Sequence, residues 1–451
     1  MSAAGVASPA IASFLRLLGL VRAGDTGMIP EADITPVAGL PDADELDADP
    51  PPRDVLDATV IIKLNGGLGT SMGMDRAKSL LVVKDGLSFL DIIVRQCLAM
   101  RARHGVRLPL VLMNSFRTRD DSLAVLSGYP ELASDVDADF LQHKVPKVRA
   151  DDLMPVQWDR DRSMEWCPPG HGDLYAAVVT SGMLETLRDR GYRYAFVSNA
   201  DNLGATLDER ILAWFAREGM PFLMEAADRT EADRKGGHLA HTADGRLVLR
   251  ESAQCPGGDV EAFSDVKRHR YFNTNTLWLD LDALAGVLEA NDGIVPLPLI
   301  RNEKTVDPTD AESPAVYQLE TAMGAAISTF DGAGAIRVPR TRFAPVKTTN
   351  DLLGLWSDGY VLSEGYRVVV NPERPAESGT LFVDLDPASY RYVSSLEERF
   401  PAGAPSLVAC RRFVVRGDVR FGGGVVVRGD VEVDADSCGG MVPDGTVLDG
   451  A

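Results

Sequence analysis

The sequence predicts an α/β protein whose mixed, mostly parallel sheet is covered by helices on both faces. Apolar runs of strand length alternate with helical stretches from about residue 58 onward, which is the pattern of such folds. A glycine-rich loop follows the first apolar run directly, and a chain of 451 residues is long enough for two or three domains. Ligands of such sheets bind beyond the carboxyl ends of the strands. The residues that follow the strands are therefore the first candidates for a functional site.

The first element is an apolar run at 11–21, interrupted by Arg16, which predicts an amphipathic surface helix. No Lys or Arg precedes it, so we expect no signal peptide, and it is too short to span a bilayer. Later patterns predict strands at 58–62, 108–113, 194–198 and 221–224 and helices at 89–103, 173–190 and 206–218.

Residues 25–57 break this pattern with an acidic, proline-rich stretch. Segment 41–57 holds seven acidic residues, one Arg and four Pro, which predicts an irregular strap or linker. The whole chain carries 46 Lys plus Arg and 66 Asp plus Glu, a formal charge of −20. This charge excludes general attraction to a nucleic acid polymer or an anionic membrane. Any phosphate ligand must therefore meet a local cluster of Lys, Arg, backbone N–H groups and metal ions.

The C-terminal part contains a repeat. VVRGDV at 414–419 recurs at 426–431, twelve residues later, and a multiple of six predicts a β-helix. The alternative is a hairpin of two Val-rich strands joined by the glycines at 422–424. The composition breaks predict three units, at 1–57, 58–385 and 386–451. Five scattered cysteines without a CxxC pair favour neither a zinc site nor a disulfide framework, so we expect a reducing, cytoplasmic location.

Two loops carry glycines in the pattern of anion sites. KLNGGLGTSMGMDRAKS at 63–79 has four glycines within eight residues and ends near Lys78, although it is neither a P-loop nor GxGxxG. PPGHGD at 168–173 places His171 between two glycines, with Asp173 expected as an N-cap. A flexible turn and a surface turn are the respective alternatives.

Polar residues follow or interrupt three further elements. Asn199 and Asp201 end a predicted strand, where a carboxylate is placed to hold Mg²⁺ unless it only forms a turn. Asn273 and Asn275 alternate with apolar residues, so both amides share one face, suited to sugar hydroxyls or to the solvent face of an edge strand. Lys347 precedes a predicted helix start and, taken alone, is an ordinary surface residue.

Together these motifs resemble the eukaryotic-type family of UTP–glucose-1-phosphate uridylyltransferases, the UDP-glucose pyrophosphorylases. The resemblance covers roughly residues 60–445 in the order of the family. It implies a Rossmann-like, GT-A-like fold of the nucleotide-diphospho-sugar transferases, followed by a C-terminal left-handed β-helix. The motifs that carry it are LNGGLGTSMG (64–73), PPGHGD (168–173), FVSNADNLGAT (196–206), FNTNTLW (272–278), QLETAMGAAI (318–327) and PVKTTNDLL (345–353).

The resemblance also implies roles for individual residues. Lys78 and Lys347 correspond to catalytic lysines, and Asp201 to a ligand of Mg²⁺, the one cofactor expected. Gln142 corresponds to the residue that meets the uracil edge, and His171 to the partner of glucose 1-phosphate. The implied nucleotide-binding set is Leu64, Asn65, Gly66, Gly67, Lys78, Gln142, Gly170, Asn199, Asp201 and Lys347. The implied substrate-binding set is His171, Asn199, Asn273, Asn275 and Glu320.

The implied reaction joins UTP and glucose 1-phosphate to give UDP-glucose and pyrophosphate. A uridylyltransferase for N-acetylglucosamine 1-phosphate or several sugar 1-phosphates is the alternative, since the sugar pocket is not fixed by one sequence. A second alternative is a catalytically inactive scaffold or regulator with the same fold. Such a protein would be expected to have lost Lys78, Asp201 or Lys347, and all three are present. Lys63 is expected to add positive charge at the site.

Three features depart from the family pattern. Asp75 brings a negative charge near an anionic ligand, and Leu141 replaces a usual Asn. The sequence does not decide whether the protein forms a homo-oligomer, but we expect the chain to lack the last β-helix coil with which animal members assemble end to end.

Overall fold

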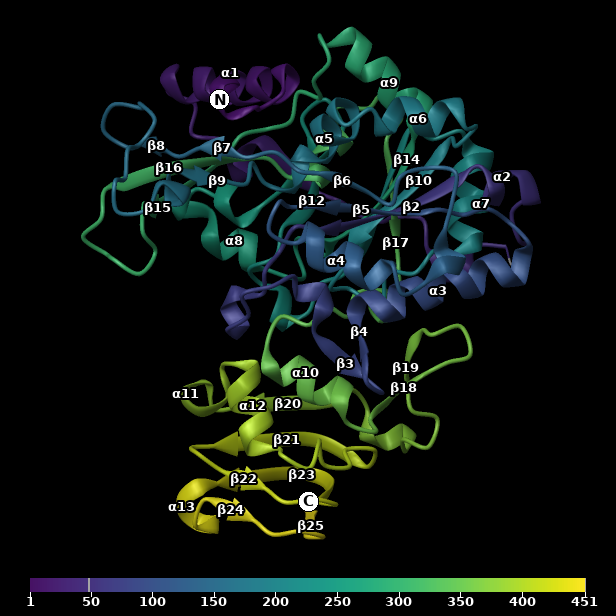
Figure 1. Ribbon diagram of the computed structural model, residues 1–451, viewed down its shortest axis with the longest axis vertical. Coiled ribbons are helices and arrows are strands. Elements are labelled where there is room, and N and C mark those ends of the chain that lie inside the picture. Colours follow the sequence, from purple (N-terminus) through teal and green to yellow (C-terminus); the bar gives the residue numbers. More distant parts are fainter. Residues whose placement is uncertain (48, 451) are drawn as a thin grey trace.

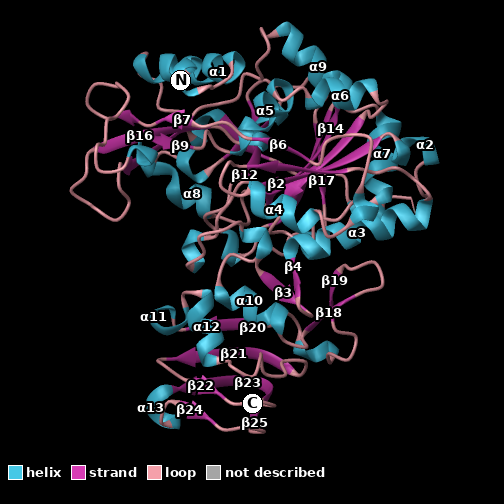
Figure 2. Ribbon diagram, in the orientation of Figure 1, coloured by secondary structure: helices cyan, strands magenta, loops and turns pink. Residues whose placement is uncertain are grey.

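A mixed sheet of ten strands forms the centre of the molecule (Figures 1 and 2), which a computed structural model describes over residues 1–47 and 49–450. The main path runs β1-β12-β14-β10-β2-β5-β6, and β10, β2, β5 and β6 are parallel. β14 is antiparallel to β10, which makes the sheet mixed as predicted. The strands are β1 Ile34–Pro36, β2 Thr59–Asn65, β5 Leu110–Asn114, β6 Asp139–Leu141, β10 Tyr194–Asn199, β11 Phe222–Asp228, β12 His238–Thr242, β13 Leu247–Arg250, β14 Tyr271–Asp280 and β17 Gly334–Arg337.

Helices cover both faces of this sheet, as the sequence predicts. One apolar core joins α3, α4 and α7 to Ile61 and Phe196 of the sheet, and a second joins α5, α6 and α9 to Val60 and Val197. The predicted helix over 173–190 is two helices, because Gly182 breaks it with φ of 75°. The helices are α2 Arg53–Asp57, α3 Phe89–His104, α4 Arg119–Leu126, α5 Leu174–Thr180, α6 Met183–Asp189, α7 Glu209–Glu218, α8 Val260–Ser264 and α9 Leu281–Ala290.

The N-terminal segment is packed onto this body. The apolar run forms α1 (Ser8–Arg22), whose buried face lies against α5 and a small sheet of β15 Ile300–Thr305, β16 Ala315–Glu320 and β8 Val148–Arg149. The strap at 41–57 is more regular than predicted, because it contains α2, which packs on α7; just before it, β1 pairs with β12. Asp42 and Asp44 both form ion pairs with Arg337, so part of the acidic excess is neutralised locally.

The C-terminal part stacks parallel strands below the main body (Figure 1), next to the hairpins β3–β4 and β18–β19. Phe413 pairs with Val431 and Val414 with Glu432, eighteen residues on, so the twelve-residue repeat is not the pairing period. The alternative hairpin is wrong, because β21 and β23 are parallel. The elements are β3 Val82–Lys84, β4 Leu87–Ser88, α10 Thr349–Trp356, β18 Tyr360–Leu362, β19 Val368–Val370, β20 Phe382–Leu385, α11 Pro387–Tyr390, α12 Val393–Arg399, β21 Cys410–Arg416, β22 Arg420–Phe421, β23 Val426–Asp434, α13 Ala435–Cys438, β24 Met441–Val442 and β25 Val447–Asp449.

Two short strands, β7 Val145–Pro146 and β9 Trp166–Cys167, lead into the loop that carries His171. Across the described residues, no helix combines the length and the apolar character needed to cross a bilayer.

Candidate active site

The glycine loop leaves the carboxyl end of β2 and meets Gln142 at the end of β6. A methyl group on Gly66 would lie 2.7 Å from Gln142 Oε1, so the amide would have to move if any other residue stood here. Gly67 has open space around it, which leaves its backbone accessible to a ligand. The Asn65 amide is already engaged, because it donates to Asn114 Oδ1 at 2.7 Å and ties two strand ends together. The structure thus brings the predicted loop and the predicted base-reading residue into contact.

Lys78 and Asp201 form an ion pair at the same edge of the sheet. The distance from Lys78 Nζ to Asp201 Oδ2 is 2.7 Å, and both side chains are partly buried. Lys78 also closes the glycine loop, because its backbone N–H donates to the Gly67 carbonyl at 3.0 Å. Asn199 and Leu64 stand opposite each other where parallel strands β10 and β2 end. Two residues that lie 123 positions apart are therefore joined by the parallel register of the two strands.

The segment that carries Lys347 runs beside the Asp201 loop. Asn202 fastens the two segments, because its amide donates to the Arg342 carbonyl at 3.1 Å and accepts from Ala344 N–H at 3.0 Å. The Val346 N–H also donates to the Asp201 carbonyl. Lys347 itself is exposed, and no acidic partner lies within 4 Å of its ammonium among the described residues. The ammonium lies over the ring of Phe343, 5.4 Å from its centroid, in the segment that runs beside the Asp201 loop.

A buried ion pair supports both of these loops from below. Glu225 is fully buried and accepts from Arg342 Nε at 2.7 Å and from Arg342 Nη2 at 2.6 Å. The same carboxylate accepts from Trp278 Nε1 at 3.0 Å. Arg342 Nη2 also donates to the Thr206 carbonyl, five residues after Asp201. The sequence did not predict this support, because no local pattern pairs residues 117 positions apart.

The His171 loop is held in place by the segment after β16. The Gly172 N–H donates to the Thr321 carbonyl at 2.9 Å, and Gly170 (φ 80°) lies against Thr321 and Glu320. His171 Nδ1 accepts from the Met323 N–H at 3.0 Å, so the imidazole proton is on Nε2. Burial lowers the pKa of His171 from 6.5 to about 4. His171 therefore offers a neutral N–H donor over the whole physiological range of pH.

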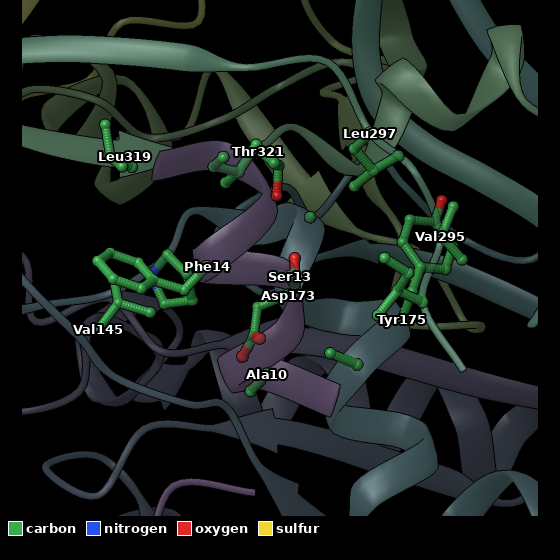
Figure 3. A pocket seen from close by; sticks show the side chains of 15 residues that line it. Ala10, Ser13, Phe14, Val145, Asp173, Tyr175, Val295, Leu297, Leu319 and Thr321 are labelled. Carbon is green, nitrogen blue, oxygen red and sulfur yellow. The ribbon is translucent and has the colours of Figure 1, made fainter. Parts of the chain in front are cut away.

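The N-terminal helix backs this loop from the other side. Figure 3 shows Ala10, Ser13 and Phe14 of α1 facing Asp173 and Thr321 across a small cavity. Arg16 extends the contact, because its guanidinium donates to the Leu297 carbonyl. The first helix is therefore part of the support of the His171 loop.

Asp173 occupies the N-cap position of α5, as predicted, but its side chain makes no capping hydrogen bond. Its carboxylate turns instead to His143, accepting from the His143 N–H at 2.6 Å and lying 2.9 Å from Nδ1. His143 Nε2 is in turn 3.0 Å from Thr180 Oγ1. Because His143 follows Gln142 directly, this contact links the His171 loop to the residue beside Gly66. Nothing in the sequence indicated that Asp173 would bind His143, because Asp before a helix is typical of an N-cap.

Asn273 and Asn275 lie side by side, as the alternating pattern predicts. Asn273 Nδ2 donates to Asn275 Oδ1 at 2.8 Å, and Gly324 is packed against the Asn273 amide. Their strand β14 is central in the sheet, so the alternative of a solvent-facing edge strand is wrong. Glu320 ends β16, and its pKa is raised by burial. The segment after β16 thus touches the His171 loop at Thr321 and the paired amides at Gly324.

Lys63 does not contribute to this site, against our expectation. Its side chain lies on the face of the sheet that α3 and α7 cover, where Nζ donates to Ser198 Oγ at 2.6 Å and to the Ala205 carbonyl at 2.8 Å. The positive groups at the site are therefore Lys78 and Lys347. No cluster of three or more His, Cys, Asp or Glu suited to a metal ion occurs within the described parts of the chain.

This arrangement is that of an α/β protein with a glycine-rich loop and a paired lysine and carboxylate at the carboxyl ends of parallel strands, where ligands of such sheets bind. A family model described as UTP–glucose-1-phosphate uridylyltransferase matches residues 21–428. The chain belongs to this family.

Relatives and solved structures agree with that assignment. The chain is 40% identical over 408 residues to the UTP–glucose-1-phosphate uridylyltransferase of Hordeum vulgare, covering 89% of this chain and 84% of the relative. A probable enzyme of the same name from Schizosaccharomyces pombe is 40% identical over 399 residues, with coverages of 88% and 77%. The UDP-glucose pyrophosphorylase of Leishmania major superposes with a TM-score of 0.93 at 45% identity, covering 100% of this chain and 97% of that one. A mutant of the Leishmania protein in complex with UDP-glucose gives the same TM-score and identity.

Proposed function

We propose that this protein transfers the uridylyl group of UTP to glucose 1-phosphate and releases pyrophosphate. The observation that carries the proposal is the Lys78–Asp201 pair, set between the Gly66–Gln142 contact and Lys347 at the ends of β2 and β10. Membership of the family and 40% identity to a relative with this name support the choice of reaction.

The nucleotide is proposed to lie along the glycine loop. Gln142 faces the uracil edge, because its amide is fixed against Gly66 and its backbone N–H donates to the Asn114 carbonyl. Gly67 offers its open backbone to the phosphates. The contact between His143 and Asp173 keeps the segment that carries Gln142 in position.

The reaction proceeds by attack of a phosphate oxygen of glucose 1-phosphate on the α-phosphorus of UTP. The attacking oxygen is already ionised, so no strong general base is required. Bringing the two anions together is the main difficulty, since two unit charges at 4 Å repel by about 4 kcal/mol at an effective dielectric near 20. Lys78 and Lys347 offset this repulsion, most of all as charge moves to the leaving pyrophosphate.

His171 orients the acceptor in this scheme. Its Nε2–H donates to glucose 1-phosphate, and its low pKa keeps the ring neutral so that it acts as a donor and not as an acid. Asn273 and Asn275 supply amides for the sugar hydroxyls, with Glu320 at the neighbouring segment.

Asp201 is proposed to hold Mg²⁺ together with the phosphates of UTP. A single carboxylate together with phosphate oxygens is a common magnesium site. Asp201 Oδ1 makes no hydrogen bond among the described residues, so this oxygen is available to bind the metal ion. When bound, the metal neutralises phosphate charge and stabilises the departing oxygen. We expect Asp201→Asn to raise the Mg²⁺ concentration needed for half-maximal rate. An unchanged metal titration would remove Asp201 from this role.

Lys347 is the residue on which turnover depends most in this proposal. Lys347→Ala should lower kcat by roughly 10²-fold or more, which is the scale of one lost transition-state charge stabiliser. Lys267→Ala, an exposed lysine elsewhere, serves as the control. Near-normal kcat for a folded Lys347→Ala protein would contradict the assignment.

The direct test is release of pyrophosphate from UTP and glucose 1-phosphate, measured against a panel of sugar 1-phosphates. Faster turnover of N-acetylglucosamine 1-phosphate than of glucose 1-phosphate would favour the alternative substrate. No pyrophosphate release from any sugar 1-phosphate, by a folded protein with Mg²⁺ present, would overturn the proposal.

We propose further that the C-terminal strands wind as a left-handed β-helix. Parallel pairing at offsets of eighteen and twenty-one residues supports repeated coils, as between Phe413 and Val431 and between Val426 and Val447. The division into units at residues 57 and 385 and the oligomeric state stay predictions.

A further inference from the structure

A second cavity lies on the other face of the sheet, between α3, the start of α7 and the β18–β19 hairpin. Its volume is about 380 Å³, within the range of small-molecule sites. Ile61 and Phe196 of the sheet form part of its lining, and Ile93 and Met100 of α3 form another part. No residue assigned above to UTP, glucose 1-phosphate or Mg²⁺ lines it.

Two cations of this cavity lack a counter-ion. Lys63 is only 2% exposed, and its ammonium contacts neutral oxygens of Ser198 and Ala205 without a carboxylate within 4 Å among the described residues. Arg367 of the hairpin likewise makes no ion pair with any described residue. By contrast, Arg210 in the same lining is neutralised by Asp208 at 3.1 Å.

The surroundings of Lys63 disfavour its charged form. Burial, and next the repulsion of Arg342, lower the pKa of the Lys63 ammonium to about 7, although Glu225 acts in the opposite direction. Next to the carbonyl that Lys63 contacts, Thr206 lines the same cavity, and its buried hydroxyl has no hydrogen-bond partner in the described structure. Buried polar atoms are normally satisfied, so the Thr206 hydroxyl indicates a partner that the chain does not supply.

We propose that this cavity binds a small organic acid with an apolar body and one carboxylate. The oxygens of a carboxylate would accept from the ammonium of Lys63 and from the hydroxyl of Thr206, which both line the cavity. The apolar body then lies along Ile93 and Met100, and Arg367 adds positive charge from the hairpin. The hairpin is fixed to α3, because Gln96 Nε2 donates to the carbonyl of Tyr366 at 2.9 Å. An occupant therefore contacts the sheet, α3 and the hairpin together.

The test is calorimetric titration of the full-length protein with 3-phenylpropionate while UDP-glucose saturates the active site. We expect saturable binding with a Kd of about 1 mM or below, and much weaker binding of 3-phenylpropanol and of acetate, which lack the charge and the apolar body respectively. Absence of binding, or equal affinity for 3-phenylpropanol, would overturn the proposal.

Three variants locate the site. Lys63→Met should raise the Kd about tenfold, as expected for one lost charge-assisted hydrogen bond. Ala99→Phe fills the cavity from α3 without removing a charge and should abolish binding, which keeps the test valid if Lys63→Met folds poorly. Arg412→Ala, an exposed arginine of the C-terminal strands, is the matched control and should bind normally. Binding that Ala99→Phe leaves intact would show that the acid binds elsewhere.

Discussion

The buried pair of Glu225 and Arg342 should be the most sensitive single point of the scaffold. Glu225 is completely buried and accepts three hydrogen bonds, two from Arg342 and one from the indole of Trp278. Glu225→Gln keeps the shape of the side chain but leaves the buried Arg342 charge with only Asp208, whose carboxylate lies 3.9 Å from Nη1. Breaking a buried pair in this way costs about 3–5 kcal/mol of unfolding free energy, since the more distant Asp208 compensates the remaining charge poorly.

The loss is measured from urea unfolding followed by tryptophan fluorescence, because Trp278 reports directly on the pair. Adding Arg342→Met to Glu225→Gln should recover part of the loss, since the double variant leaves no unpaired charge. Asp244→Asn, which breaks an exposed pair with Arg246, should change stability by less than about 1 kcal/mol. A loss below about 1 kcal/mol for Glu225→Gln, or a double variant no more stable than the single one, would refute this reasoning.

Two further predictions concern the His171 loop. Gly170→Ala should raise KM for glucose 1-phosphate and cost about 1–3 kcal/mol of stability. The reason is that φ of 80° with ψ of 172° is nearly confined to glycine, and the added methyl would lie 2.9 Å from Thr321 N. Gly182→Ala, which has positive φ but open space around it, is the control and should leave KM unchanged. The lowered pKa of His171 means that the unfolded chain takes up a proton between pH 6.5 and about 4 while the folded protein does not, so stability falls as the pH falls through this window. Urea unfolding across that range should show a shallower fall for His171→Gln, and equal slopes would contradict the assigned protonation.

The positions that follow strands were predictable because parallel strands bring their ends together. From the strand pattern alone, the loop after β2 and the Asn199–Asp201 turn were expected at one edge of the sheet, and the Lys78–Asp201 contact confirms that they meet. The face on which a side chain lies is harder to predict. Lys63 precedes the glycine loop directly, yet its side chain points to the α3 and α7 layer.

Contacts between distant segments account for the remaining errors. Asp173 has the residue type of an N-cap, but the carboxylate is drawn to His143, thirty positions earlier in the chain. The strap at 41–57 reads as irregular because its ion pairs with Arg337 are invisible in the local composition. The repeat VVRGDV likewise marks similar strands twelve residues apart, whereas the residues that pair are eighteen apart, which is also a multiple of six.

The Lys78–Asp201 ion pair determines which form of a ligand binds most tightly. Each group is satisfied by the other, so a free anion must compete with Asp201 for Lys78, and a free cation must compete with Lys78 for Asp201. A ligand that carries both charges, such as a nucleotide already loaded with its metal, replaces the two halves at once and leaves neither group unpaired. On the proposed assignment, the pair therefore gives the metal-loaded nucleotide a higher affinity than the free nucleotide or the free metal ion.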